Sequence, residues 1–282
     1  MTVLVLSELY FPFGWYFFRK VSSSPDDIFL LVTYITRENS VRRDELQVRG
    51  DVCGILSAQG IYVDEETIPL DSVKIRPAVI VESADMKKPA ERIFGAVTES
   101  ENDGNVAYFG EGGSIMLSGD SFSLVYESGK EIMSDADALR LAGSIASKLY
   151  VSTSASELIC EGTDGGYIVR VPRFISGVPV FDCGVEVKIS QSGSVIASGK
   201  FIGKGKLRES AGEVMRTSAL MLEFADRIKA IGHTELRVSD MKIGYISKIP
   251  ASGHATLVPA LMVETDAAVF YVDMQTGNLL KV

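Results

Sequence analysis

Hydrophobic and polar positions recur with two different periods along this chain, and each change of period marks a predicted element. From residue 42 to about residue 59 apolar positions recur every three or four residues, which predicts a helix with one buried face. Shorter apolar runs with glycine-rich turns continue to residue 126, and they predict strands. The order of the two periods indicates a helix followed by a small sheet.

The same order of periods occurs twice more. Ser134 is a predicted N-cap for a helix that ends near Leu149, and four strand-like runs follow between residues 157 and 202. Ser210 and Glu213 have the spacing of a capping box, and the apolar stripe of a third helix ends near Ile231. Strand-like runs then fill most of the chain to its end. Because the apolar faces of a helix and of a sheet must cover each other, the predicted fold class is α+β: consecutive modules of one helix packed on a three- to four-stranded antiparallel sheet.

Four segments follow from this division. Their predicted limits are 1–40 for an apolar N-terminal segment, 41–130 for a first α+β module, 131–205 for a second module and 206–282 for a third.

The N-terminal segment contains two apolar runs that do not combine into a clean membrane span. The second run, Ile28–Ile35, is too short alone, because a spanning helix needs about 20 apolar residues. Joining it to the first run would place Asp26 and Asp27 in lipid, at a cost of several kcal/mol. Two interpretations stay open: a degraded or misassigned membrane anchor whose outer end is Ile28–Ile35, and an apolar arm on a soluble protein.

The composition of the chain argues against nucleic acid as a partner and against a zinc site. The chain has 282 residues, of which 46% are hydrophobic and 23% charged, so it can form a globular core. Its net charge of −9, with no Lys/Arg block, argues against nucleic acid as a partner. Cys160 and Cys183 fall on strands expected near each other, so a disulfide between them stays an alternative to buried thiols. Only His233 and His254 accompany the cysteines, which gives little basis for a zinc site.

No catalytic, cofactor-binding or metal-ligating residue is predicted. The acidic pairs Glu65–Glu66 and Glu99/Glu101 are expected on solvated loops, because nothing in the pattern brings them into one pocket. The run 110–113 (GEGG) lacks the lysine of a phosphate-binding loop and predicts a hairpin turn. Asp273 is expected to accept backbone N–H bonds in a turn, since the oxygens of a calcium loop are missing around it. The interpretation is therefore that the chain is not an enzyme.

Two groups of motifs carry a resemblance to known families. The first group comprises residues 167–180, with the sequence Gly177-Val178-Pro179-Val180 at its end, and the hairpin formed by 185–189 and 192–196. It resembles the PepSY-like modules of protease propeptides and secreted regulators. There the proline marks a turn or sheet edge, and Gly177 is expected to adopt a positive φ.

The second group resembles YycI, a regulatory protein of a two-component system. Residues 242–245, 258–263 and 269–277 look like the C-terminal module of YycI, with Gly277 expected to adopt a positive φ. Residues 28–37 and 59–63 resemble the end of its membrane anchor and its first module.

The resemblance implies a function and a location. It implies a membrane-anchored accessory protein, with its bulk on the extracytoplasmic side, that modulates a WalK-type sensor histidine kinase controlling cell-wall metabolism. The implied partners are that kinase, a YycH-like protein and the membrane, and a homodimer through an open sheet edge remains compatible. Two alternatives stay open: a PepSY-like inhibitor or chaperone of a secreted protease, and an extracytoplasmic ligand-binding module.

Overall fold

The computed structural model describes residues 45–282, apart from 71–74, 81–84, 103, 152–156, 201–206, 210–211, 249–255 and 281–282. The chain divides into two compact units, 1–51 and 52–282. The predicted N-terminal segment 1–40 lies outside the described residues, as do His254 and Ser210. Among the described helices, none combines the length and hydrophobicity needed to cross a bilayer.

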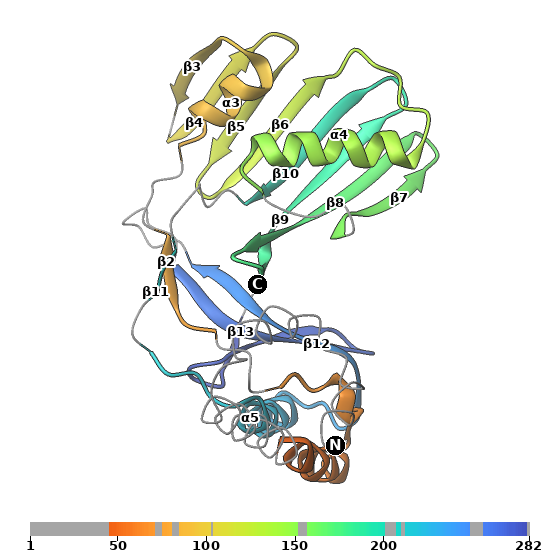
Figure 1. The fold of residues 1–282 in the computed structure, drawn as a ribbon, viewed down its shortest axis with the longest axis vertical. Helices are drawn as coiled ribbons and strands as arrows, with labels where there is room; N and C mark the ends of the chain where they lie inside the picture. The colour runs from red at the N-terminus through yellow and green to blue at the C-terminus, as the bar shows by residue number, and fades with distance from the viewer. Residues whose placement is uncertain are drawn as a thin grey trace, which may run out of the picture. The chain divides into compact units, whose positions relative to one another are not determined.

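The second unit is dominated by strands (Figure 1). Its first strands are β1 (Ile61–Tyr62), β2 (Ala78–Ile80), β3 (Val97–Asn102), β4 (Asn105–Gly110), β5 (Gly113–Ser118), β6 (Ser121–Glu127), β7 (Ile159–Thr163) and β8 (Gly166–Ile175). The remaining strands are β9 (Val178–Ser190), β10 (Ser194–Lys200), β11 (Leu207–Glu209), β12 (Leu236–Lys248), β13 (Thr256–Thr265), β14 (Val269–Asp273) and β15 (Leu279–Leu280). The helices are η1 (Glu65–Thr67), α3 (Lys87–Phe94), α4 (Asp135–Lys148) and α5 (Thr217–Ala230), and residues 45–58 are also helical.

The strands of the described residues form one mixed sheet of fifteen strands, and this finding overturns the predicted fold class. Its main path runs β11-β2-β13-β12-β9-β10-β6-β5-β4-β3, with β7 and β8 attached through β9. The predicted three- to four-stranded sheets are not separate, because their edge strands pair with one another. β6 pairs antiparallel with β10 along its whole length, and β12 joins β9 in parallel through Tyr245 and Val180. Such joins satisfy the N–H and C=O groups that an unpaired edge would leave open.

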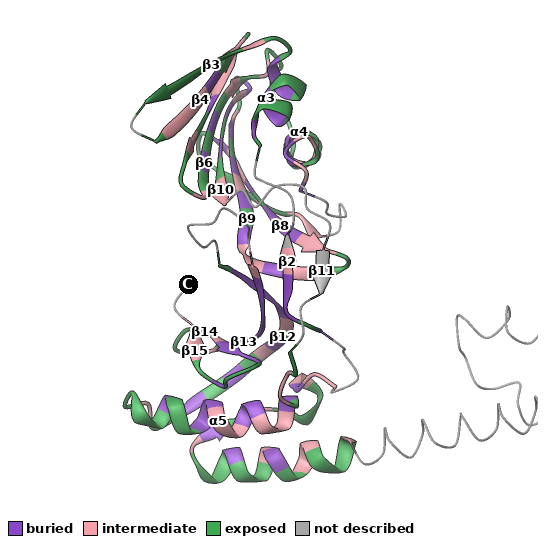
Figure 2. Cartoon of the chain, turned by 90° about the vertical axis from the view of Figure 1, so that its left-hand side faces the viewer, coloured by how far each residue is buried: buried purple, intermediate pink, exposed green. Residues whose placement is uncertain are grey.

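Buried side chains gather in two cores. The α4 core lies between helices α3 and α4 and one face of the sheet formed by β4–β6 and β8–β10, as Figures 1 and 2 show. The α5 core packs α5 and residues 52–56 against β12, β13 and β14. Strand β9 contributes to both, with Val180 and Cys183 in the α5 core and Val185 and Val187 in the α4 core.

Helix α4 begins as its sequence predicts, whereas α5 does not. Ser134 is the N-cap of α4, and its hydroxyl oxygen accepts a hydrogen bond from the Asp137 backbone N–H at 3.2 Å. Helix α5 begins at Thr217, so the capping box predicted at Ser210 and Glu213 is wrong as a helix start. The segment before α5 is bonded elsewhere, since the Met215 N–H donates to the Met274 carbonyl at 2.7 Å. This tertiary bond takes up the Met215 N–H just before α5, so it is not available for an intrahelical bond.

The predicted turn chemistry is confirmed at several positions. Gly177 and Gly277 have φ values of +80° and +69°, a region that favours glycine. Pro179 lies in the hairpin between β8 and β9, where it pairs with Phe174. The Asp273 carboxylate accepts hydrogen bonds from the N–H groups of Gln275 and Thr276, at 2.8 and 3.3 Å.

Candidate interaction surface

The acidic and glycine-rich segments considered for chemistry are dispersed over the described fold. Glu65 and Glu66 are exposed on η1, whereas Glu99 lies on β3, with an oxygen 4.0 Å from the ammonium of Lys87. The GEGG run forms the turn between β4 and β5, with Gly112 at φ +75°. Within the described residues no three His, Cys, Asp or Glu side chains are grouped to hold a metal ion.

A buried polar network lies where β9, β10 and β12 meet. The Asp182 carboxylate, only 3% exposed, accepts hydrogen bonds from the backbone N–H and the hydroxyl of Ser247, at 2.9 and 2.7 Å. It also pairs with the ammonium of Lys200 at 2.8 Å. A second carboxylate, Asp120 in the β5–β6 turn, lies 3.8 Å from the same ammonium. Asp182 thereby connects three strands of the sheet through one side chain.

Two titratable groups of this network are shifted by their surroundings. Burial acts to lower the pKa of Lys200, but its hydrogen bond and ion pair with Asp182, together with Asp120, outweigh burial and raise the pKa. Lys200 therefore stays charged. The Cys183 thiol donates to the Ser247 hydroxyl at 3.3 Å, and burial followed by the Asp182 charge raises its pKa to about 12.

Cys183 is consequently a poor nucleophile. The thiolate is the reactive form of cysteine, and a raised pKa keeps the thiol protonated at neutral pH. The network therefore holds strands together and does not present a reactive group: the Asp182 carboxylate is bonded to several donors, and the Cys183 thiol is protonated.

Cys183 is expected to resist alkylation in the folded protein. At pH 8 a thiol of pKa about 12 is ionised in only about one molecule in ten thousand. Iodoacetamide followed by peptide mapping should label Cys183 on the order of 100-fold more slowly than the half-buried Cys160, and at an equal rate in urea. Equal labelling of the two cysteines in the folded protein would contradict the protonated, buried state of Cys183.

The alternative of a Cys160–Cys183 disulfide does not fit the topology. All three cysteines are free thiols. Cys160 is on β7 and Cys183 on β9, with β8 paired between them. Two strand spacings of about 4.8 Å exceed the roughly 7 Å limit between the Cα atoms of a disulfide.

A sheet face that no described helix covers is the other distinctive feature of the unit. The strand registers place ten side chains in two rows across β3, β4, β5, β6 and β10, on the side opposite α3 and α4. We call these ten positions the open face. The first row is Thr98, Phe109, Ser114, Val125 and Ile196, and the second is Ser100, Ala107, Met116, Ser123 and Ser198.

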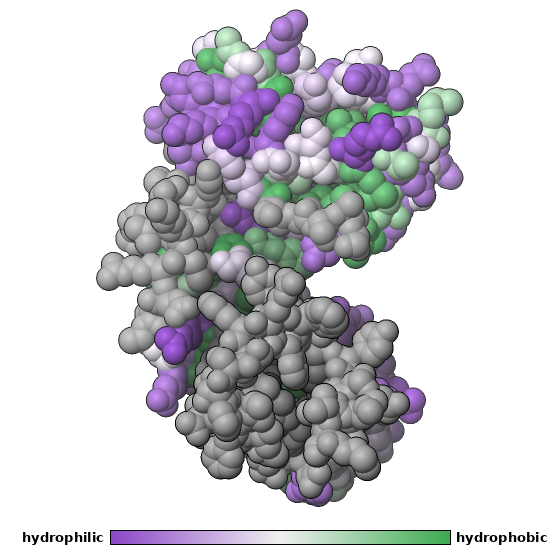
Figure 3. All heavy atoms as spheres, in the orientation of Figure 1, coloured by the Kyte–Doolittle hydropathy of each residue, from purple (hydrophilic) through white to green (hydrophobic). Residues whose placement is uncertain are grey.

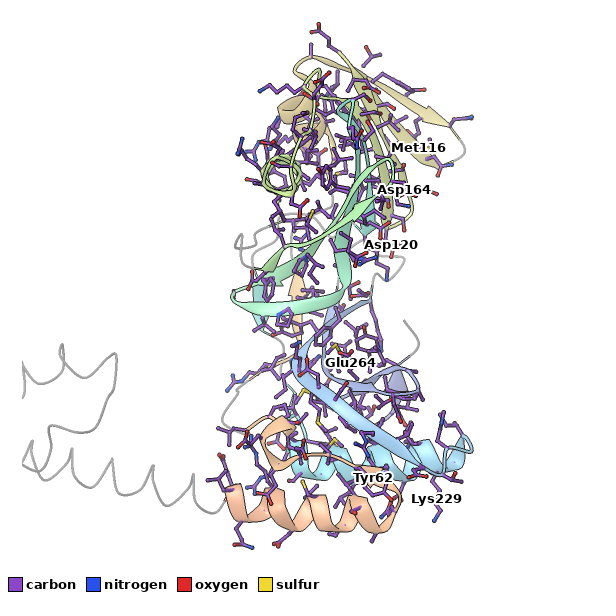
Figure 4. The ribbon with its side chains drawn as sticks, turned by 90° about the vertical axis from the view of Figure 1, so that its right-hand side faces the viewer. Tyr62, Met116, Asp120, Asp164, Lys229 and Glu264 are labelled. Atoms are coloured by element: carbon purple, nitrogen blue, oxygen red, sulfur yellow. The ribbon has the colours of Figure 1, made fainter. Side chains whose placement is uncertain are left out.

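The open face is uncharged, and half of its ten positions are hydrophobic. Four of its side chains are large, hydrophobic and between 44% and 52% exposed: Phe109, Met116, Val125 and Ile196. The other six are Ser, Thr or Ala, so none of these ten described positions carries a charge. In Figure 4, Met116 lies on the side of the sheet away from α4. Figure 3 shows the helix-bearing side, where hydrophilic residues gather over α3 and the neighbouring strands.

The same two rows contain charged residues where they continue beyond β10 into the neighbouring strands. The next strands, β9, β8 and β7, contribute Lys188, Glu186, Arg170 and Glu161 to this side. Arg170 pairs with Glu161 at 2.5 Å and with Glu186 at 3.6 Å. The uncharged character is therefore confined to the open face and is not general to this side of the sheet.

The sequence carries a signal for the open face that motif-based reasoning misses. In β4, β5 and β6 the positions alternate between buried residues, such as Tyr108, Ile115 and Leu124, and outward residues. Outward positions of a solvated sheet are ordinarily polar and often charged. At the ten positions of the open face they are hydroxyl-bearing or hydrophobic, which is unusual for a surface in contact with water alone.

Comparisons with known proteins bear on the fold. No protein-family profile matches the chain, and no curated protein is significantly similar to it. A crystal structure of an uncharacterized protein from Eubacterium rectale ATCC 33656 is similar with a TM-score of 0.50 and 13% identity, over 74% of this chain and 86% of that one. This likeness concerns the fold alone. The Bacillus megaterium YpeB C-terminal domain matches 72% of this chain and 96% of its own, with 14% identity and a TM-score of 0.34, which supports no inference.

Proposed function

We propose that this chain is an extracytoplasmic accessory protein that acts by binding and modulates a WalK-type sensor histidine kinase together with a YycH-like protein. Its motifs in 242–277 resemble those of YycI, and the motifs in 167–180 resemble PepSY-like regulatory modules. The membrane attachment in this proposal belongs to the N-terminal segment 1–40.

The observation that carries the proposal is the open face. Solvent-exposed apolar side chains that cluster without intervening charges are typical of protein-binding surfaces, whose centres are depleted of charged residues. Phe109 and Met116 also belong to the residue types enriched at such centres. A binding role through this face agrees with the inert character of the Asp182 network.

A lysine at position 116 is expected to abolish the regulatory effect. Deleting the gene should change the phosphorylated fraction of the kinase's response regulator, because the accessory protein would no longer bind. Restoring the gene with Met116→Lys should reproduce the deletion, since a charge in the centre of an apolar contact must be desolvated. The phosphorylated and unphosphorylated forms can be separated on a phosphate-affinity gel.

Met133→Lys is the matched control. Met133 is 78% exposed and lies outside the open face, between β6 and α4, so the same substitution there should behave as the wild type. Immunoblots must show equal amounts of the three proteins. An unchanged phosphorylated fraction in the deletion strain would refute the kinase role.

Cell fractionation separates this function from the protease-inhibitor alternative. Regulation at the membrane requires the chain to sediment with membranes until detergent is added. Recovery of the full chain in the culture medium without detergent would favour a PepSY-like inhibitor or chaperone of a secreted protease.

A further inference from the structure

We infer that the open face binds a second copy of this chain, which forms a two-fold symmetric dimer by packing sheet against sheet. The inference rests on the proposed role of the open face as a binding surface, and it makes the second copy, not the kinase, the partner that this face contacts directly.

Charge is the first argument for a second copy. With a net charge of −9, two copies repel each other at long range, so the surfaces that meet should add no further like-charge contacts. The open face is uncharged, whereas the adjoining strands β7, β8 and β9 carry both signs. A neutral, apolar surface is complementary to another surface of the same kind, and the second copy supplies one.

The arrangement of side chains is the second argument. A two-fold axis parallel to the strands, between β5 and β6, places β4 of one copy over β10 of the other. It sets Phe109 over Ile196 and the long side chain of Met116 over the small Ser123, each contact occurring twice. Large residues thus meet apolar or small ones, as the isologous contacts of a two-fold dimer require.

The size of the open face predicts a weak dimer. With this axis the overlapping strands of the open face are β4, β5, β6 and β10. Four strands spaced about 4.8 Å apart, with about six residues of 3.3 Å rise, cover roughly 20 Å by 20 Å of sheet. Two such faces bury roughly 800 Å² in total, which is below the range of stable specific interfaces and typical of weak, transient ones. The dimer should therefore form and dissociate with concentration.

Sedimentation velocity over a range of concentrations tests the dimer. From about 5 to about 500 µM the wild-type chain should pass from monomer towards twice the monomer mass. Met116→Lys should weaken the association about 100-fold, because the two-fold axis brings two new like charges close together. Met133→Lys should associate as the wild type does. Circular dichroism and thermal unfolding must show that both variants are folded.

A second variant guards against a folding defect. Val125→Thr keeps the shape and strand preference of the side chain but adds a hydroxyl, and it should weaken the association about tenfold. A wild type that stays monomeric at all concentrations would overturn the inference, as would a dimer that both open-face substitutions leave intact. If the wild type is monomeric while Met116→Lys still abolishes kinase regulation, the proposed function stands and the second copy is excluded.

Discussion

Asp182→Ala is expected to lower the free energy of unfolding by about 3–5 kcal/mol, because it removes one partner of a buried ion pair. The substitution would leave the Ser247 N–H and hydroxyl buried without the acceptor that both share. It would also leave the Lys200 ammonium without its nearest carboxylate. Since Lys200 is 34% exposed, water can solvate part of its charge, and the lower end of the range is expected. Urea unfolding followed by circular dichroism measures the change.

Asp120→Ala provides the comparison for this experiment. Asp120 approaches the same ammonium at 3.8 Å but is 35% exposed, so its removal should cost less than about 1 kcal/mol. Equal losses in the two variants would show that the Ser247 hydrogen bonds contribute little, and would contradict the role given to Asp182.

Gly193→Ala is expected to lower the free energy of unfolding by about 2–4 kcal/mol, because the new side chain meets both an unfavourable positive φ and a steric overlap. Gly193 closes the hairpin between β9 and β10 at φ +87°, and its carbonyl accepts a hydrogen bond from Ser128 at 3.0 Å. A Cβ atom there would overlap the backbone carbonyl oxygen of Lys130. The turn would have to move away from the segment that leads into α4, and thermal or urea unfolding would report the loss.

Gly177→Ala separates the two causes. Gly177 has a similar φ of +80° in the turn between β8 and β9, but a Cβ atom there meets nothing within 4 Å. Its substitution should therefore lower the free energy of unfolding only by the strain of a positive φ in alanine, about 1–2 kcal/mol. Losses of the same size at both glycines would mean that the contact with Lys130 is relieved at little cost.

Local features of the fold follow closely from the sequence. The apolar alternation in the first part of β12, the continuous apolar run of β13, the N-cap of α4 and the turn at Asp273 all depend on residues near one another in the chain. The physical signals for them are side-chain periodicity and turn chemistry, and both are visible in a short window.

The joining of the sheets does not follow from the sequence in the same way. Strand β9 meets β12 through the pair Val180 and Tyr245, far apart in the chain, and no local pattern encodes that contact. Strand β3 was not predicted because its sequence VTESEN is mostly exposed and lacks apolar alternation. Edge strands of this kind are charged to discourage further pairing, which hides them from a hydrophobic pattern.

The open face could be predicted from the sequence only in part. Phe109, Met116 and Val125 are visible as apolar residues in the sequence, but only the registers of β4, β5 and β6 show that they share one face. A search for catalytic motifs gives no weight to such residues, because the signal is the absence of charge from a whole set of outward positions.

Strand β9 limits how this fold can change in evolution. Its thirteen residues, Val178–Ser190, place side chains in both cores, so inserting or deleting a single residue within it would reverse the inward and outward positions on one side of the change. The α4 core would then receive Lys188 or Glu186 in place of valine. Changes of length should accordingly be tolerated in the turns that flank β9 and not within the strand.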